Sequence, residues 1–246
     1  MKRKAILFGN TNGLQGVSVD LLNYEKFLQL SEGGAWDDNE IITLPNPSKW
    51  QLKALIASAK LDATDFVFVV YSGHGGYNRS TILEINGEGE TIDEKDLWNI
   101  APRQITILDC CRGTESELTP IEKSVKSLND SIVGSTRSLI RTAYNKRIMS
   151  ASIQQVKLYS CSIGETSIDT GRNGGGLYTK NLFQAINDSV YADYLTINDA
   201  HAKACIYTSQ EAKEKHNHEQ NPDSSVIRCS HSQQLIVGIN PSVILL

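Results

Sequence analysis

Short apolar runs alternate with amphipathic stretches over the first 110 residues of the chain. Apolar runs typical of strands occupy residues 4–8, 40–44, 65–71 and 105–108. Between them, apolar side chains recur at helical spacing over residues 19–30 and 50–61. This alternation predicts a mostly parallel sheet. The run 65–71 is apolar at every position after its aspartate, which indicates a central strand covered on both faces.

The pattern changes after residue 113. Residues 114–155 are rich in Ser, Thr, Lys and Arg, and we expect them to form an exposed, partly helical insert. Order resumes with a strand at 156–159, helices beginning near 177 and 196, and a final strand at 234–239. The sequence therefore predicts one α/β domain over residues 1–246, a three-layer helix–sheet–helix sandwich around a mostly parallel central sheet.

Composition narrows the classes of function. The chain has 246 residues, 40% of them hydrophobic, and a net charge of −4, which argues against a nucleic-acid binder. Its longest apolar run, residues 66–70, is far shorter than the roughly 20 residues of a membrane span. The apolar stretch at 5–8 is too short for a signal peptide. We expect a cytoplasmic protein that binds neither nucleic acid nor membrane.

Thiols and imidazoles give no sign of a structural metal or a disulfide framework. The five cysteines are scattered and odd in number, so we expect them to be reduced. His216 and His218 lie in a charged segment that offers no third ligand at regular spacing, and we assign no metal site to them.

Two predicted strands end in polar, glycine-containing segments. His74 follows the run 65–71 in SGHGG, and Cys111 follows the run 105–108 in DCCRG. Open α/β sheets bind ligands at these carboxyl ends. Each residue alone fits a structural role, in a turn or as a small buried side chain. Together they favour a thiol nucleophile with an imidazole base, the backbone amides of Gly75 and Cys111 stabilising the oxyanion.

Three stretches resemble the caspase-like cysteine peptidases, the clan of caspases, metacaspases and their bacterial relatives. YSGHGG at 71–76 is similar to the histidine motif of the clan, and ILDCCRG at 107–113 to its cysteine motif. The stretches at 156–167 and 174–186 resemble the strand, polar loop and helix start that follow. The likeness covers about residues 3–190 and is nearest to bacterial, orthocaspase-type proteins. It implies that His74 is the general base and acid and Cys111 the nucleophile.

The resemblance to metacaspases also implies an acidic S1 pocket. Asp109 precedes the nucleophile by two residues, Asp20 matches a second pocket acid through LQGVSVD, and Ser72 matches a third wall residue. Two carboxylates in a partly desolvated slot select Arg or Lys. Asp20 fits a helix-start carboxylate equally well. Arg112 and Gly113 are similar to the residues at the same places of the caspase motif and differ from those of metacaspases, so the cysteine motif alone does not fix the P1 preference.

An acidic pocket makes the basic residues of the predicted insert candidates for self-cleavage. We expect it at Lys146 or Arg147, the alternative being the basic face of a helix. Metacaspases often bind calcium through aspartates, but NGEGETIDEKD at 86–96 lacks the spacing of an EF-hand loop. We therefore predict no cofactor, and calcium dependence stays open.

These features predict a cysteine endopeptidase that cleaves protein or peptide substrates after Arg or Lys and processes itself within 114–155. No obvious recruitment domain accompanies the peptidase domain, so we expect a regulatory or effector protein partner. Two alternatives remain. One is a catalytically inactive caspase-fold interaction module, since fold does not fix function. The other is a thiol hydrolase that acts on small substrates rather than peptides.

Overall fold

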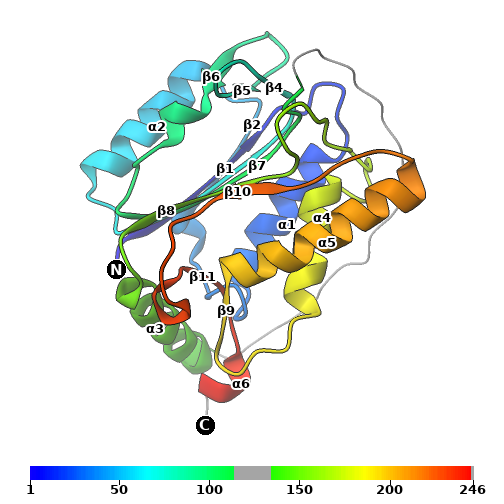
Figure 1. Cartoon of the computed structure of the whole chain (residues 1–246). Helices are drawn as coiled ribbons and strands as arrows, with labels where there is room; N and C mark the ends of the chain where they lie inside the picture. Colours follow the sequence, from blue (N-terminus) through cyan, green and yellow to red (C-terminus); the bar gives the residue numbers. More distant parts are fainter. Residues whose placement is uncertain (114–133, 245–246) are drawn as a thin grey trace.

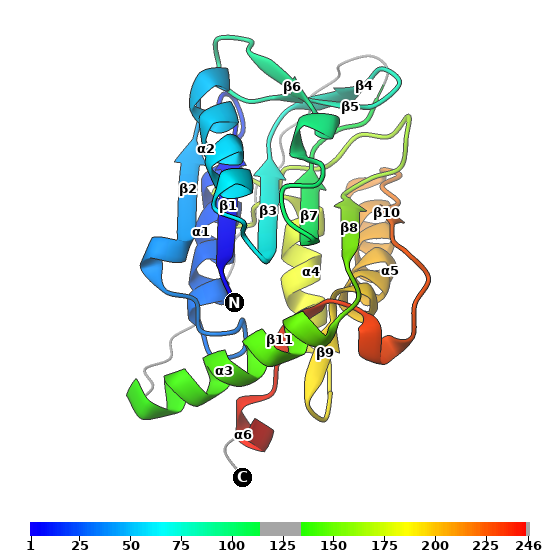
Figure 2. The ribbon, with the colours of Figure 1, turned by 90° about the vertical axis from the view of Figure 1, so that its left-hand side faces the viewer.

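The computed structural model describes residues 1–113 and 134–244 and is built on a six-stranded sheet in the order β10-β8-β7-β3-β1-β2 (Figure 2). All pairings are parallel except that of the edge strand β10. The strands of this sheet are β1 (Arg3–Gly9), β2 (Ile41–Pro45), β3 (Phe66–Ser72), β7 (Arg103–Asp109), β8 (Gln154–Tyr159) and β10 (Asp223–Ser225). The predicted mostly parallel sheet is confirmed.

Helices cover both faces of the sheet (Figure 1). One face carries α1 (Val17–Gln29), α4 (Leu177–Asn187) and α5 (Ile197–His216). The other face carries α2 (Lys49–Leu61). The N-cap of this helix is Ser48, and its hydroxyl accepts the N–H of Gln51. A separate cluster of buried apolar side chains fills each interface, so the three-layer α/β sandwich is confirmed.

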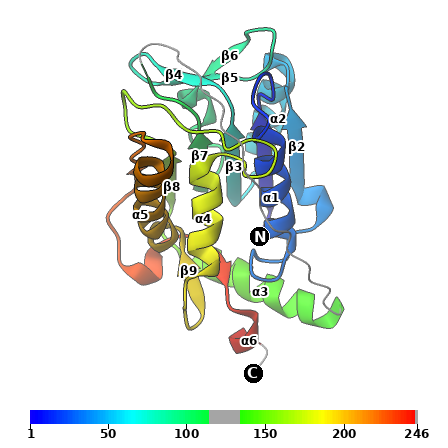
Figure 3. The same cartoon turned by 90° about the vertical axis from the view of Figure 1, so that its right-hand side faces the viewer.

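Smaller elements close the two ends of the sandwich. A three-stranded hairpin sheet, β4 (Gly75–Tyr77), β5 (Thr81–Glu84) and β6 (Thr91–Asp93), lies beyond the carboxyl ends of the strands, with the 3₁₀ helix η2 (Glu94–Leu97) after it. The opposite end holds β9 (Tyr194–Thr196), β11 (Ile236–Ile239) and α3 (Gly134–Ser150) (Figure 3). The short elements η1 (Asp38–Glu40), η3 (His231–Gln233) and α6 (Pro241–Ile244) complete the described chain. None of the helices in residues 1–113 and 134–244 combines the length and apolar character that a bilayer crossing requires.

Strand register places the candidate catalytic residues. All seven residues of β3 are buried, and Ser72 pairs with Gly9 of β1 and with Asp109 of β7. The three strands therefore end level with one another. His74 and Cys111 each lie two residues beyond a paired strand end, which brings both to the same edge of the sheet.

The expectation of an exposed insert is wrong for the part that the structure describes. Residues 134–150 form α3, and Ile140, Tyr144 and Ile148 on it are 0% exposed and belong to the core. Arg141, which follows Ile140 on the helix, lies 3.1 Å from Asp37 and also pairs with Glu40. Three buried side chains at a spacing of four were enough to pack the helix, although polar residues fill the positions between them.

The last strand, expected at 234–239, is present as β11, which pairs antiparallel with β9 in a small sheet of its own. The edge strand β10 was not predicted, because its three residues, Asp-Ser-Ser, carry no apolar signal. It pairs with β8 through residues 223–225.

Candidate active site

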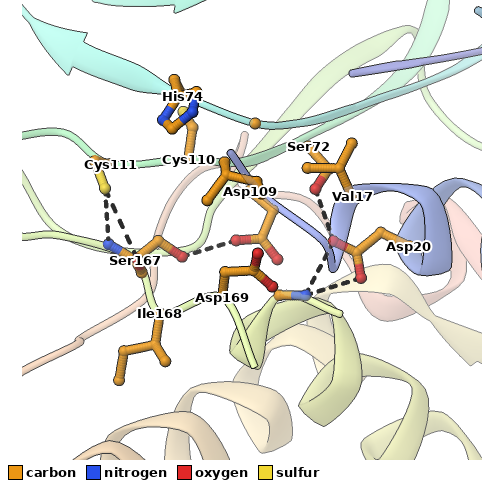
Figure 4. Close-up of a pocket in the computed structure, with 13 residues that line it drawn as sticks. Val17, Asp20, Ser72, His74, Asp109, Cys110, Cys111, Ser167, Ile168 and Asp169 are labelled. Atoms are coloured by element: carbon orange, nitrogen blue, oxygen red, sulfur yellow. Dashed lines mark hydrogen bonds between the residues drawn. The ribbon is translucent and has the colours of Figure 1, made fainter. Parts of the chain in front are cut away.

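The chain segments that carry His74 and Cys111 are packed directly against each other. The Gly73 N–H donates to the carbonyl oxygen of Asp109 at 3.1 Å, joining the ends of β3 and β7. A Cβ atom on Gly75 would lie 2.8 Å from Cys110 Sγ and 3.0 Å from the Cys111 carbonyl oxygen, so only glycine fits there. His74 and Cys111 both line one pocket (Figure 4).

The imidazole of His74 is held in a defined tautomer. Its Nε2 lies 2.6 Å from the carbonyl oxygen of Asn12. Because a carbonyl oxygen only accepts, Nε2 carries the proton and Nδ1 keeps its lone pair. The backbone is held as well: the Tyr71 hydroxyl donates to the His74 carbonyl oxygen at 2.6 Å, and the Glu84 N–H donates to it at 3.0 Å. The ring therefore presents a basic nitrogen.

The thiol of Cys111 is not activated by its surroundings alone. Burial raises its pKa and the nearby Asp109 carboxylate raises it further, while the backbone N–H of Ser167, 3.3 Å from Sγ, lowers it. The net pKa lies above the ordinary value, so the resting sulfur is protonated at neutral pH. No hydrogen bond joins this sulfur to His74 in the described residues, although both face the same pocket.

The residues flanking Cys111 are structural. Cys110 is buried. Arg112 is buried too: its guanidinium lies 3.9 Å from the centre of the Tyr159 ring and donates to Thr81 Oγ1 and the Cys161 carbonyl oxygen. Arg112 is not among the residues that line the pocket, so we infer no P1 preference from the presence of arginine at this position.

Asp20, Ser72 and Asp109 line the same pocket as the Cys–His pair. Asp20 is 1% exposed, and its carboxylate accepts the Ser72 hydroxyl at 2.7 Å and the Gly176 N–H at 3.0 Å. Burial raises its pKa well above the ordinary value, the Asp109 carboxylate adds to the rise, and the two hydrogen bonds oppose it. Asp20 also lies in the first turn of α1, so its position is compatible with a pocket acid and with a helix-start carboxylate.

Asp109 is held by donors from the other side of the pocket. Its carboxylate accepts the N–H and hydroxyl of Thr179 at 3.0 and 2.7 Å and the Ser167 hydroxyl at 2.8 Å. Burial raises its pKa, and the donors from Thr179 and Ser167 limit the rise. Two buried carboxylates therefore meet at one end of the pocket, each already supplied with hydrogen-bond donors.

The sequence analysis missed a third carboxylate. Asp169, in the loop between β8 and α4, lines the pocket and accepts the backbone N–H groups of Gly16 at 3.1 Å and Gly171 at 2.8 Å. Unlike Asp20 and Asp109, it is partly exposed. Asp169 lies in a polar loop that follows a buried strand, and the same sequence pattern after β3 identified His74 as a candidate.

The predicted self-cleavage residues are not in an exposed loop. Lys146 and Arg147 lie in the last part of α3, at the end of the sandwich opposite the pocket (Figure 3). Arg147 donates to the His231 carbonyl oxygen at 3.3 Å, and the following Ile148 is 0% exposed. Peptidases of this kind act on extended chain, so cleavage here requires α3 to unwind. Of the other basic residues of that segment, Arg137 and Arg141 also lie on α3, and Lys123 and Lys126 lie outside the described residues.

The histidines near the end of α5 are not brought into a metal site. His218 Nε2 lies 3.1 Å from the Thr166 hydroxyl and 3.0 Å from the Thr166 carbonyl oxygen. Within residues 1–113 and 134–244, no three His, Cys, Asp or Glu side chains are grouped as metal ligands.

Comparison with known proteins identifies the fold family. Caspase-1 from Spodoptera frugiperda superposes with a TM-score of 0.56 at 14% identity, covering 91% of this chain and 86% of its own. A protein from Geobacter sulfurreducens superposes with a TM-score of 0.58 at 12% identity, covering 96% and 97%. Identities this low show a shared fold alone, and no curated protein matches the sequence. The sequence model of the caspase domain matches residues 2–229, so the chain belongs to the caspase domain family.

Proposed function

We propose that this protein is a cysteine endopeptidase that cleaves its substrates after Arg or Lys. One observation carries the proposal: a thiol, an imidazole with a free basic nitrogen and three carboxylates line a single pocket. Membership of the caspase domain family supports peptidase chemistry, but a fold alone does not fix a function. The thiol, imidazole and carboxylates that line the pocket support the proposal beyond the fold.

Chemistry begins with proton transfer to His74. Nδ1 takes the proton of Cys111 as the sulfur attacks the carbonyl carbon of the scissile bond. This base is needed because the pKa of the thiol is raised. The imidazolium that forms keeps its Nε2–H bond to the Asn12 carbonyl oxygen and then protonates the leaving amine. Water, deprotonated by the same nitrogen, hydrolyses the thioester and frees the sulfur.

Backbone amides beside the sulfur stabilise the oxyanion of the tetrahedral intermediate. The Cys111 N–H lies next to its own Sγ and lowers the pKa of that thiol. Gly75 packs against the side chain of Cys110 and the carbonyl oxygen of Cys111 with no room for a Cβ atom. We infer that the amides of these two adjacent segments, at Gly75 and Cys111, form the oxyanion hole.

Specificity comes from the acidic end of the pocket. A P1 guanidinium or ammonium entering beside Asp20, Asp109 and Asp169 gains attraction from each carboxylate. An acidic P1 side chain meets repulsion from the same groups. Because burial raises the pKa values of Asp20 and Asp109, a bound cation also favours their ionised forms and lowers those pKa values.

The test uses fluorogenic peptides that differ only at P1, assayed with the wild type and with Cys111→Ala and His74→Ala. We expect turnover after Arg and Lys, little after Ala and none after Asp, and loss of turnover in both variants. A preference for Asp overturns the acidic pocket, and turnover in Cys111→Ala overturns the nucleophile.

Two other functions give different results in the same experiment. An inactive interaction module shows no turnover, and Cys111 in it does not react with an arginyl chloromethyl ketone. A thiol hydrolase of small substrates turns over esters or simple amides but leaves Arg-containing peptides intact. The imidazole of His74, which lines the same pocket as the Cys111 thiol, favours an active enzyme, and the carboxylates favour the basic peptide substrate.

A further inference from the structure

We propose that Asn10 is a positioning residue for His74: it fixes the loop whose carbonyl oxygen sets the tautomer of the imidazole. The catalytic consequence rests on the proposed function, but the tautomer can be measured without it. Asn10 directly follows β1, on the same edge of the sheet as the ends of β3 and β7, and is 0% exposed.

Every hydrogen-bonding atom of the Asn10 side chain has a partner. Oδ1 accepts the Asn12 N–H at 3.0 Å. Nδ2 donates to the Asn86 carbonyl oxygen at 3.1 Å and to Glu84 Oε1 at 3.2 Å. One buried amide therefore ties the β1–α1 loop to the hairpin of β5 and β6, two segments more than 70 residues apart in sequence.

Both of these segments hold His74. On the loop side, the Asn12 carbonyl oxygen accepts Nε2–H of the ring. On the hairpin side, the Glu84 N–H donates to the His74 carbonyl oxygen, and the Tyr71 hydroxyl contacts the carbonyl oxygens of both His74 and Glu84. Asn10 thus connects the support of the ring to the support of the backbone.

Apart from the bond to Asn10, few hydrogen bonds restrain the β1–α1 loop at Asn12. Asn12 and Gly13 are exposed, and they form the middle of a turn closed by the Leu14 N–H and the Thr11 carbonyl oxygen at 3.3 Å. Gly13 has φ +72°, as in a type II turn, in which Asn12 holds the position that proline favours. The bond from Asn10 fixes residue 12 in this turn. Without it the Asn12 carbonyl oxygen moves, Nε2 loses its acceptor, and Nδ1 is protonated in part of the molecules.

The first measurement is the ¹⁵N NMR spectrum of histidine-labelled protein, at a pH where the rings are neutral. The chain has five histidines, and the signals of His74 are those lost in His74→Gln. In the wild type we expect Nε2 to carry the proton. In Asn10→Ala we expect a mixture of both tautomers at His74. The matched control is Thr11→Val, which removes the hydroxyl that accepts Asn46 Nδ2–H in the same loop but leaves Asn12 alone, and it should match the wild type.

The second measurement is turnover of a P1-Arg peptide. A displaced base lowers kcat on the order of 100-fold in Asn10→Ala while KM changes little, because substrate contacts remain. Adding Asn12→Pro to Asn10→Ala should restore part of kcat and the wild-type tautomer, because the proline ring fixes φ at the turn position that the Asn10 bond otherwise fixes. A role of Asn10 in folding alone is not rescued in this way.

The outcomes separate the inference from the proposed function. A wild type without turnover refutes the peptidase and leaves the NMR comparison intact. An unchanged His74 tautomer in Asn10→Ala, an equal effect of Thr11→Val, or failure of the proline rescue overturns the role of Asn10. If Asn10→Ala does not fold, Asn10→Ser replaces it: the serine hydroxyl can still accept the Asn12 N–H and places no second oxygen against the Asn86 carbonyl oxygen and Glu84 Oε1, so loss of the Nε2–H tautomer there also overturns the inference.

Discussion

Asp20→Asn tests whether the buried carboxylates select the P1 side chain. In the complex with a cationic P1 side chain, which favours the ionised form of Asp20, the change removes one charge and keeps the shape. The asparagine oxygen can still accept the Gly176 N–H, and its amide can donate to Ser72 Oγ, which then accepts instead of donating. The pocket therefore stays closed by the same partners, and the variant differs from the wild type mainly in electrostatics.

The size of the effect follows from Coulomb's law. A guanidinium about 4 Å from a carboxylate gains about 4 kcal/mol at an effective dielectric constant of about 20. Removing one partner of a desolvated charge pair costs roughly 2–5 kcal/mol in practice. Asp109 and Asp169 remain in the pocket, so the low end of this range applies. We expect kcat/KM for P1-Arg peptides to fall roughly 30-fold or more.

The assay compares kcat/KM for two peptides, one with Arg and one with Gln at P1. The ratio of the two values should fall in Asp20→Asn, whereas kcat/KM for the Gln peptide should stay near that of the wild type. Asp188→Asn, an exposed change at the end of α4, is the matched control and should leave both values unchanged. An unaltered Arg/Gln ratio in a folded Asp20→Asn variant would show that this carboxylate does not contact P1.

Four further outcomes are expected. The contribution of Asp20 to the free energy of unfolding should fall as pH rises above about 4, because the unfolded chain releases the Asp20 proton first while burial raises the pKa of Asp20 in the folded chain; urea titrations at several pH values should show the free energy of unfolding of the wild type falling relative to that of Asp20→Asn. Gly75→Ala should lower kcat by at least tenfold, since its Cβ atom would meet Cys110 Sγ and the Cys111 carbonyl oxygen, and steady-state kinetics on a variant with unchanged circular dichroism checks this. Tyr144→Ala should lower the free energy of unfolding in urea by roughly 3–5 kcal/mol, because the ring is wholly buried. Intact-mass analysis of the wild type should show no cut after Lys146 or Arg147, and a cut there that Cys111→Ala abolishes would contradict the packing of α3.

The sequence predicted the parts of the molecule that strand patterns determine. A short all-apolar run bounded by polar and glycine residues is typical of a strand buried on both faces, so β3 and its neighbours follow from residue order, and with them the edge of the sheet where His74 and Cys111 lie. The strand that leads to Cys111 also ends at Asp109, which lines the same pocket. These positions depend on local pattern and on the register of adjacent parallel strands.

Other features depend on contacts that no local pattern encodes. α3 packs through Ile140, Tyr144 and Ile148, but the polar residues between them make its composition resemble an exposed segment. Asp169 reaches the pocket because its carboxylate accepts the Gly16 N–H, a contact across 153 residues. The tautomer of His74 likewise depends on a carbonyl oxygen 62 residues away. Chain folding decides these contacts, and residue spacing does not.

The loop between β8 and α4 contacts both the Cys111 thiol and the buried carboxylates. Ser167 donates its backbone N–H to Cys111 Sγ and its hydroxyl to Asp109 Oδ1, so one residue contacts both groups. Two residues on, Asp169 joins the same loop to the start of α1, close to Asp20. Because one stretch of backbone positions the partners of the thiol and of the carboxylates, we expect a change in this loop to alter the proposed P1 specificity and the reactivity of the thiol together.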